Sequence, residues 1–498
     1  MQANGFAKLA NGHDVGCNGA GGKKLLTLDD VNPSVRAIAY AIRGPINDRA
    51  NQLDSDLRNG KKLPFDKLIR CNVGDAPAMG QKPMTFYRQL LACCAYPDAS
   101  TQYPADVQAL SKRFLDACHG RTIGSYISNP QGLEVVRQDI AKFIQERDGG
   151  IPAYANEIFL FTGAGDGIVC ILNILNTTSA GKKPIGLMVP IPTFAYYTSC
   201  IDEIGLKEIP YYLDEENSWQ LNVDELNRAI NNRDDCDPKI LVVINPGNPT
   251  GQVLTKDNIQ QIIRFAAEKN LIIMADEVYQ DNIHDSSQKF HSFKKTIADM
   301  GHPYCDMELI SLHSASKGLM NECGARGGYV EFHNFDQEVL DQLRKLLSIR
   351  SSPSTGQLAT FAMVNLPKPG DPSYDLFIKE RESTRSSLVQ RARMTTELLN
   401  NIPGMHCNAV QGAMYAFPRL DLPEKFIQEA KTKGRAADLH YVMQLMDSKG
   451  VVIVPGSGFR QQPGTYHFRT TILPPVDLLH EMLEKLADFH TNLMKKYA

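Results

Sequence analysis

Seven short apolar runs alternate with longer amphipathic segments in the middle of the chain. Most of the runs are continuously apolar, which is typical of strands that are buried on both faces of a sheet. The segments between them have helical spacing; residues 255–270, for example, begin with a threonine suited to cap a helix. The pattern predicts an α/β fold with a seven-stranded, mostly parallel sheet between helices. The predicted strands span residues 157–161, 185–190, 208–213, 239–244, 271–276, 308–314 and 327–332.

The pattern changes after residue 366. A stretch rich in proline and glycine is followed by a long polar helix, two shorter strand candidates and a last amphipathic helix, which predicts a smaller α+β domain. The ranges of these four segments are 366–375, 376–402, 414–420 with 450–456, and 476 onward. We therefore divide the chain into a flexible tail, an N-terminal arm with part of the small domain, a large domain, and the C-terminal small domain, at 1–30, 31–100, 101–365 and 366–498.

Composition narrows the class of protein. The chain has 498 residues, 43% of them hydrophobic and 22% charged, and a net charge of −3, so nothing favours a nucleic-acid or membrane partner. It has eleven cysteines but no CxxC pair, which favours free thiols in a reducing compartment and argues against a metal site. Residues 1–24 lack the apolar core of a signal peptide, so we expect a cytoplasmic protein; a mitochondrial location stays open.

Polar residues follow several predicted strands, at the sheet edge where open α/β folds bind ligands. The turn TGAGDGI, residues 162–168, exposes backbone N–H groups at the start of a helix and suits a phosphate. Its third position for a dinucleotide fingerprint is Ile168 rather than glycine, so that interpretation fails, and a plain turn stays an alternative. After the next strands, Asn248 either points into a cleft or only shapes a turn, and Asp276 either meets a cationic ligand or forms a structural contact.

Lys317 directly follows an apolar strand and two serines. A buried ammonium is costly to desolvate, so a lysine at this position calls for a chemical reason. Arg326 lies nine residues further on in a glycine-rich loop, where it suits a phosphate unless it is a surface arginine. A lysine that can form an imine, a carboxylate that can pair with a pyridinium and an anion site together match pyridoxal phosphate.

The motifs of the chain resemble those of the fold-type-I aminotransferases, which depend on pyridoxal phosphate, and within them the alanine aminotransferases. The resemblance covers nearly the whole chain from about residue 30. It is carried by NPGNPTG (245–251), ADEVY (275–279), HSASKG (313–318), NECGARGGY (321–329) and QGAMYAFPRL (411–420).

The resemblance implies a role for each of several residues. Lys317 forms the Schiff base with the cofactor and moves the proton, and Asp276 pairs with the ring nitrogen. Arg469 grips the substrate carboxylate, with Asn248 and Gly74 also at the substrate. Tyr126 reaches the phosphate of the neighbouring subunit in a homodimer. The remaining cofactor-binding residues are Ala164, Gly165, Asp166, Phe194, Tyr279, Ser314, Ser316 and Arg326.

Four positions depart from the usual residues of the family. Ala195 stands where proline is usual, and Leu319 and Ala325 stand where tyrosines are usual. We expect these three near the cofactor pocket, where they bear on substrate preference. Arg460 replaces a frequent glycine, and it either adds a cation near Arg469 or is an exposed side chain.

The reaction implied by the resemblance is reversible, ping-pong transfer of the amino group from L-alanine to 2-oxoglutarate, giving pyruvate and L-glutamate. Two alternatives stay open: a glutamate:glyoxylate aminotransferase, and a non-catalytic sensor that binds pyridoxal phosphate on the same fold. The presence of Lys317, Asp276 and Arg469 together favours an enzyme. Its expected partners are amino acids, 2-oxo acids and a second copy of the chain.

Overall fold

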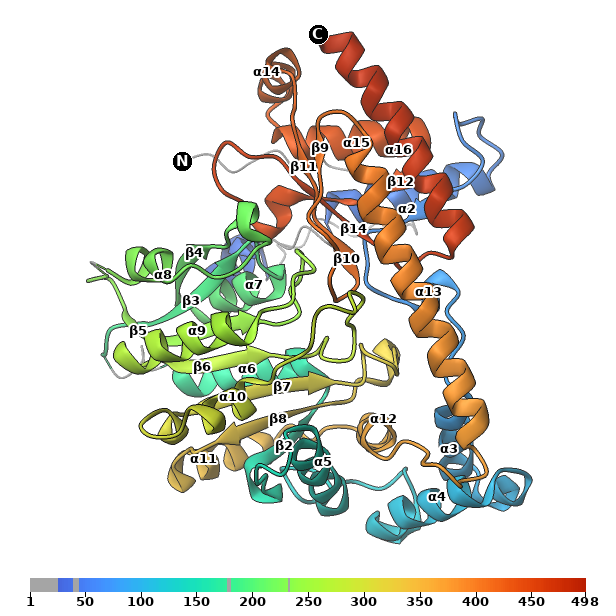
Figure 1. Ribbon diagram of the computed structural model, residues 1–498, viewed down its shortest axis with the longest axis vertical. Coiled ribbons are helices and arrows are strands. Elements are labelled where there is room, and N and C mark those ends of the chain that lie inside the picture. Colours follow the sequence, from blue (N-terminus) through green and yellow to red (C-terminus); the bar gives the residue numbers. More distant parts are fainter. Residues whose placement is uncertain (1–25, 39–43, 177–180, 232) are drawn as a thin grey trace, which may run out of the picture.

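A seven-stranded sheet forms the centre of the larger part of the protein (Figure 1). The structure is a computed structural model that describes residues 26–38, 44–176, 181–231 and 233–498. The strand order is β2-β8-β7-β6-β5-β3-β4, and β8 is antiparallel to both of its neighbours while the other pairs are parallel. All seven predicted strands are confirmed, with bounds Ile158–Phe161 (β2), Ile185–Ile191 (β3), Lys207–Tyr212 (β4), Asp237–Ile244 (β5), Ile272–Asp276 (β6), Leu309–Ser314 (β7) and Gly328–His333 (β8).

Two layers of helices explain why the central strands are apolar at consecutive positions. Successive side chains of a strand point to opposite faces, so Leu241 and Val243 of β5 pack with one layer, and Val242 packs with the other. The first layer holds α8 (Val223–Ile230), α9 (Lys256–Glu268) and α10 (Phe293–Met300). The second holds α6 (Ala164–Leu175), α7 (Ala195–Ile204) and α11 (Gln337–Leu347).

The predicted cap of the helix after residue 255 is confirmed. The Thr255 hydroxyl accepts a hydrogen bond from the backbone N–H of Asn258 at 3.2 Å, which satisfies one of the free donors in the first turn of α9. No described helix combines the length and the apolar composition that a membrane crossing requires.

The smaller part of the protein is built on the long helix α13 (Tyr374–Asn400), which runs from beside α3 (Thr85–Ala95) of the large domain up into the small domain (Figure 1). The predicted strands at 414–420 and 450–456 are each divided in two. The first divides before Pro418, which lacks a backbone donor, and the second divides because its halves pair with different strands. The remaining elements are β9 (Met405–His406), β10 (Tyr415–Ala416), β11 (Arg419–Leu420), α14 (Glu424–Thr432), α15 (Ala437–Lys449), β12 (Val451–Val452), β13 (Val454–Pro455), β14 (Phe468–Thr471) and α16 (Val476–Tyr497).

The N-terminal segment divides its contacts between the two parts. Residues 1–25 of the predicted tail lie outside the described residues, and α1 (Pro33–Ala37) follows. Helix α2 (Pro45–Arg58) and strand β1 (Ile69–Arg70) belong to the core of the small domain. Helix α3 (Thr85–Ala95) packs instead in the core of the large domain, with α4 (Ala105–Ala117), α5 (Glu134–Arg147) and α12 (Ser354–Val364). We therefore propose that the large domain begins near residue 85 rather than 101.

A buried ion pair fastens a helix layer to the sheet. The Lys294 ammonium of α10 lies against the Glu331 carboxylate of β8, and the two side chains are 0% and 1% exposed. Burial raises the pKa of Glu331, while the charge of Lys294 opposes the rise. Such a pair costs much desolvation energy, so each partner depends on the other.

We expect Lys294→Met to lower the free energy of unfolding by about 3–5 kcal/mol, because Glu331 is then buried without its cation. Replacing both partners, as Lys294→Met with Glu331→Leu, is expected to recover most of that loss. Urea unfolding of the single and double variants measures both effects. Lys295→Met is the matched control, since its ion pair with Asp299 is partly exposed and changes stability by about 0.5 kcal/mol at most. A double variant as unstable as the single one would contradict this account.

Candidate active site

A cavity of about 690 Å³ lies where the carboxyl ends of the central strands meet the small domain. Every residue predicted for the site lines it except Asp166 and Tyr126. The predicted residues that it brings together are Gly74, Ala164, Gly165, Phe194, Asn248, Asp276, Tyr279, Ser314, Ser316, Lys317, Arg326 and Arg469. Most of them follow strands β2, β5, β6 and β7, as expected for an open α/β sheet.

Lys317 stands on a turn that is fixed by its own serines. The Ser314 hydroxyl donates to the backbone oxygen of Gly327 at 2.8 Å and accepts from the backbone N–H of Ser316 at 3.1 Å. The Lys317 ammonium donates to the backbone oxygen of Gly74 at 2.7 Å. A carbonyl from the N-terminal segment, rather than a carboxylate, therefore holds the lysine.

Arg326 and the start of α6 form a site for an anion. The guanidinium donates to the backbone oxygens of Thr162 and Cys323, each at 3.2 Å, which aims it at the first turn of the helix. Gly163 has a φ of +79°, and a Cβ there would lie 2.7 Å from Nη2 of Arg326, so only glycine leaves room for this approach. The backbone N–H groups at the N-terminus of α6 and the arginine share one concavity.

Asp166 has a different place from its neighbours in that turn. Its carboxylate accepts from the backbone N–H of Thr162 at 3.1 Å, so the side chain stabilises the strand-to-helix turn. The predicted contact of its backbone with a phosphate stays a prediction.

Asp276 ends β6 as a buried carboxylate without a full counter-charge. It accepts hydrogen bonds from the Tyr197 hydroxyl at 3.1 Å and from the backbone N–H of Val278 at 3.4 Å. Burial raises the pKa of Asp276 to about 6, against the opposing effects of Tyr197, Val278 and Lys317. A cationic group in the cavity would complete the environment of this carboxylate.

The next residue, Glu277, belongs to a different network. Its carboxylate accepts from the backbone N–H of Phe293 at 2.9 Å and lies 3.8 Å from the Arg147 guanidinium. Burial raises the pKa of Glu277 to about 7, while Arg147 opposes the rise. Of the two adjacent acids in the motif, one therefore serves the cavity and the other the large-domain core.

Arg469 is held in a fixed plane deep in the cavity, where it is 1% exposed. Its Nη1 donates to Oδ1 of Asn248 at 3.1 Å, and its Nη2 donates to the backbone oxygen of Asn72 at 2.7 Å. The guanidinium also lies between two rings, 4.1 Å from the centre of Tyr415 and 4.4 Å from that of Phe459. This arrangement presents a planar, pre-oriented cation that suits a carboxylate.

Sequence reasoning missed Tyr415 and Tyr197, although both lie in stretches rich in aromatic residues. Tyr415 covers Arg469 and accepts a hydrogen bond from the Tyr279 hydroxyl at 3.3 Å. Burial alone would raise the pKa of Tyr415, but the charges of Lys317 and Arg469 bring it below its ordinary value. Tyr197 stands three residues after Phe194 on α7, so helical spacing is the signal that could have placed it near the site.

Tyr126 and the four departing residues lie outside this cavity. Tyr126 is 89% exposed, and Ala195 is buried at the start of α7. Leu319 lines a separate cavity, and Ala325 packs at the edge of the α3–α5 core. Arg460 forms an ion pair with Glu208 at 2.9 Å, so the alternative of an added cation at the Arg469 site is not supported.

One group of side chains of the metal-binding type occurs among the described residues. His302, Cys305 and Asp306 place ligand atoms within 4.8 Å of one another on an exposed turn away from the cavity. His302 Nδ1 lies 2.9 Å from an Asp306 oxygen, as in an ordinary surface contact. The expectation of a protein without a metal stays a prediction.

Comparison with known proteins agrees with this geometry. The family model described as aminotransferase class I and II matches residues 90–489. Alanine aminotransferase 2 of Xenopus laevis is 50% identical over 480 residues, which cover 95% of this chain and 88% of the relative. Alanine aminotransferase 1 of Bos taurus is 49% identical, covering 96% and 97%.

Solved structures agree on the fold. That of an alanine aminotransferase from Pyrococcus furiosus has a TM-score of 0.72 at 24% identity and covers 93% of this chain and all of its own. The predicted fold class, with its mostly parallel seven-stranded sheet, is thereby confirmed. With the family model matched over most of its length, the chain belongs to the class I and II aminotransferases.

Proposed function

We propose that the protein is an alanine aminotransferase, which transfers the amino group of L-alanine to 2-oxoglutarate and gives pyruvate and L-glutamate. The observation that carries the proposal is one cavity in which Lys317, Asp276 and Arg469 converge. Transamination needs an amine, a carboxylate and a planar cation that can bind the carboxylate of the substrate. The relatives named above supply the choice of alanine, because they are about half identical over nearly their whole length.

The residues of the cavity fit pyridoxal phosphate. Arg326, Ser314, Ser316 and the start of α6 would hold the phosphate, and the approach that Gly163 allows gives this anion site its shape. Asp276, whose pKa is raised by burial, would face the cationic ring nitrogen.

Three further side chains complete the proposed ring site. Phe194 would lie against the ring, and Asn248 and Tyr279 would meet its hydroxyl. When bound, this cofactor supplies an electrophilic carbon for the amine and a ring that withdraws the electron pair left at Cα.

Lys317 is the proposed general base and acid. Its Nζ would remove the proton from Cα of the amino acid and return a proton to the cofactor carbon that is bound to the substrate nitrogen. The carbonyl of Gly74 accepts a hydrogen bond from Nζ and orients it, and Nζ acts as base when it is the neutral amine. Because donor and acceptor use the same cavity in turn, the kinetics are expected to be ping-pong.

Arg469 is the proposed carboxylate site for both amino acids and 2-oxo acids. Its Nη atoms are anchored by Asn248 and Asn72, and its faces are covered by Tyr415 and Phe459. A substrate carboxylate would therefore meet a cation whose conformational entropy has already been lost.

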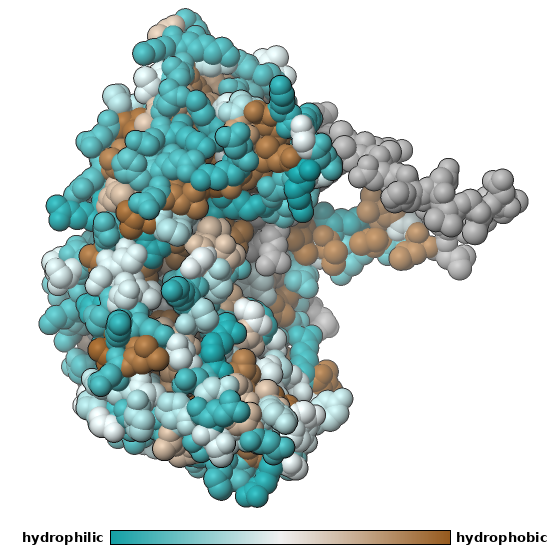
Figure 2. Space-filling model, turned by 90° about the vertical axis from the view of Figure 1, so that its right-hand side faces the viewer, coloured by the Kyte–Doolittle hydropathy of each residue, from teal (hydrophilic) through white to brown (hydrophobic). Residues whose placement is uncertain are grey.

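We also propose a homodimer in a reducing compartment. Tyr126 is 89% exposed, and Leu26, Leu28 and Val35 near the N-terminus are 72%, 71% and 48% exposed. Figure 2 shows apolar side chains on a part of the chain that projects from the body. Apolar side chains on such a projection suit a second subunit, to which Tyr126 would extend.

The cysteines bear on the compartment. Every described cysteine is free, which favours the cytoplasm. A relative from Dictyostelium discoideum, 40% identical, is named as mitochondrial, so fractionation of cells must decide between the two.

The decisive experiment for the reaction assays alanine and glutamate as donors against 2-oxoglutarate, pyruvate and glyoxylate. We expect alanine with 2-oxoglutarate, and the reverse pair, to give the highest kcat/KM. Glyoxylate exceeding pyruvate about tenfold with glutamate as donor would instead indicate a glutamate:glyoxylate aminotransferase.

Lys317→Ala should lower kcat at least about 10³-fold, with Lys345→Ala on α11 as an unaffected control. Full activity in Lys317→Ala would refute the mechanism.

Arg469→Lys should raise KM for amino and oxo acids about 10–100-fold, because an ammonium cannot form the two parallel bonds of the guanidinium. Steady-state kinetics measure the change. Arg460→Lys is the matched control, since Arg460 pairs with Glu208 outside the cavity, and its KM should stay within about twofold of wild type. Equal effects of the two substitutions would argue against a special role of Arg469.

Asp276→Asn should stabilise the cofactor-free protein at neutral pH. The carboxyl has a folded pKa of about 6 against an ordinary 3.8, so its contribution to stability is lost as pH rises through that window. The gain from the substitution is therefore greatest above pH 6, at most about 3 kcal/mol, and shrinks towards pH 4.

Added pyridoxal phosphate should make wild type more stable than Asp276→Asn, because the cofactor supplies the counter-charge for Asp276. Thermal unfolding at pH 5 and pH 8, with and without the cofactor, measures this. If cofactor-free Asp276→Asn is less stable than wild type at pH 8, the prediction is wrong.

A further inference from the structure

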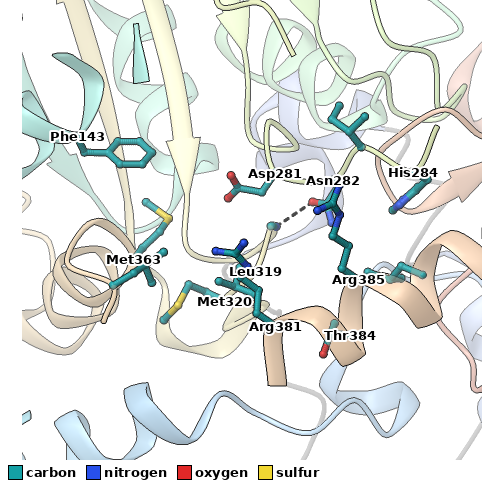
Figure 3. Close-up of a pocket in the computed structure, with 14 residues that line it drawn as sticks. Phe143, Asp281, Asn282, His284, Leu319, Met320, Met363, Arg381, Thr384 and Arg385 are labelled. Atoms are coloured by element: carbon teal, nitrogen blue, oxygen red, sulfur yellow. Dashed lines mark hydrogen bonds between the residues drawn. The ribbon is translucent and has the colours of Figure 1, made fainter. Parts of the chain in front are cut away.

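A second cavity, of about 320 Å³, lies between the loop after β6, the turn after Lys317 and the helices α12 and α13 (Figure 3). None of the residues assigned to the active site lines it. Its size is sufficient for a small-molecule ligand.

One wall of this second cavity is apolar. Phe143 of α5 and Met363 of α12 lie on one side (Figure 3), and Leu319, Met320 and Leu366 also line the cavity. These side chains are of the kind that covers a branched or aromatic group, and the two methionines can adapt to its shape.

The opposite wall carries charges of both signs. Arg381 and Arg385 rise from α13 towards the loop that bears Asp281 and Asn282 (Figure 3). Arg381 has a half-exposed ion pair with Glu382 at 3.1 Å, whereas the side chains of Asp281 and Arg385 form no hydrogen bond or ion pair with the described residues. Asp281 and Arg385 are both exposed, so their charges are open to an occupant of the cavity.

We propose that the second cavity binds a free α-amino acid with a branched or aromatic side chain. Its ammonium would lie beside Asp281, its carboxylate would face Arg381 and Arg385, and its side chain would pack on the apolar wall. A zwitterion matches separated charges of opposite sign, which neither a simple anion nor a simple amine does. The inference rests on this cavity alone and does not depend on the proposed reaction.

The position of the second cavity links it to the active site. Asn282 Oδ1 accepts from the backbone N–H of Gly318 at 3.0 Å, directly after Lys317. Gly318 has a φ of +62°, and a Cβ there would lie 2.7 Å from Oδ2 of Asp281, so the catalytic turn packs against the proposed ammonium site.

The same loop also holds the strand that covers Arg469. The backbone oxygen of Asn282 accepts from the N–H of Ala413 at 2.9 Å, and His284 contacts the oxygen of Ala413 at 2.7 Å, two residues before Tyr415. Burial lowers the pKa of His284 to about 4, so the ring is neutral and its Nε2 donates this bond. A ligand in the second cavity would therefore contact the loop after β6, which positions both the turn of Lys317 and the strand that covers Arg469.

The test is equilibrium dialysis of radiolabelled L-leucine with the holoenzyme. We expect saturable binding that Asp281→Asn and Arg385→Gln each weaken about tenfold, because each removes one charge of the zwitterion site. Arg393→Gln is the matched control, since this exposed arginine on α13 pairs with Glu397 away from the cavity. Leu319→Tyr, which fills the cavity without changing a charge, should also abolish binding.

Arg469→Lys separates the two cavities, because it weakens binding in the active site and should leave this second binding intact. 3-Methylbutan-1-amine and 4-methylpentanoate, which lack the carboxylate and the ammonium of leucine, should each compete about tenfold less well than leucine. The proposal is overturned if wild type shows no saturable binding at millimolar leucine. It is also overturned if binding is lost in Arg469→Lys and unchanged in Asp281→Asn and Arg385→Gln, which would confine leucine to the active site.

Discussion

Asp276 and Lys317 lie at the ends of neighbouring parallel strands, yet they form no ion pair with each other. The carboxylate is satisfied by a tyrosine hydroxyl and a backbone N–H, and the ammonium by a backbone carbonyl. Without these partners, two buried side chains of opposite charge would attract each other and form an ion pair that fills the cavity. The neutral partners keep the two groups apart. Both charges can therefore interact with a bound molecule, because they are not paired with each other.

The large domain was predictable because its strands are buried on both faces. Continuous apolar runs such as 239–244 leave a single interpretation, and the polar residue after each run then falls at the edge of the sheet. This argument singled out the residues that follow strands, among them Asp276 and Lys317, and the family resemblance then gave each its role. The small domain was less predictable, because strands of two residues such as β10 and β12 have no period to detect.

The residues that escaped sequence reasoning act through contacts between distant parts of the chain. Tyr415 matters because its ring covers Arg469, and the backbone oxygen of Asn72 matters because of where the N-terminal segment lies. A backbone carbonyl carries no signal in a sequence. Leu319, which was expected near the cofactor pocket, lies two residues after Lys317 and lines the second cavity.

The pairing of β1 with β12 has a consequence for how the protein is made. Ile69 and Arg70 pair with Val451 and Val452, and the carbonyls of Asn72 and Gly74 follow directly on that strand. The bond from Arg469 to Asn72 spans 397 residues of chain. At the ordinary speed of a ribosome, β1 must wait on the order of tens of seconds for its partner to emerge. The enzyme can therefore become active only after nearly the whole chain has been synthesised, however early its central sheet folds.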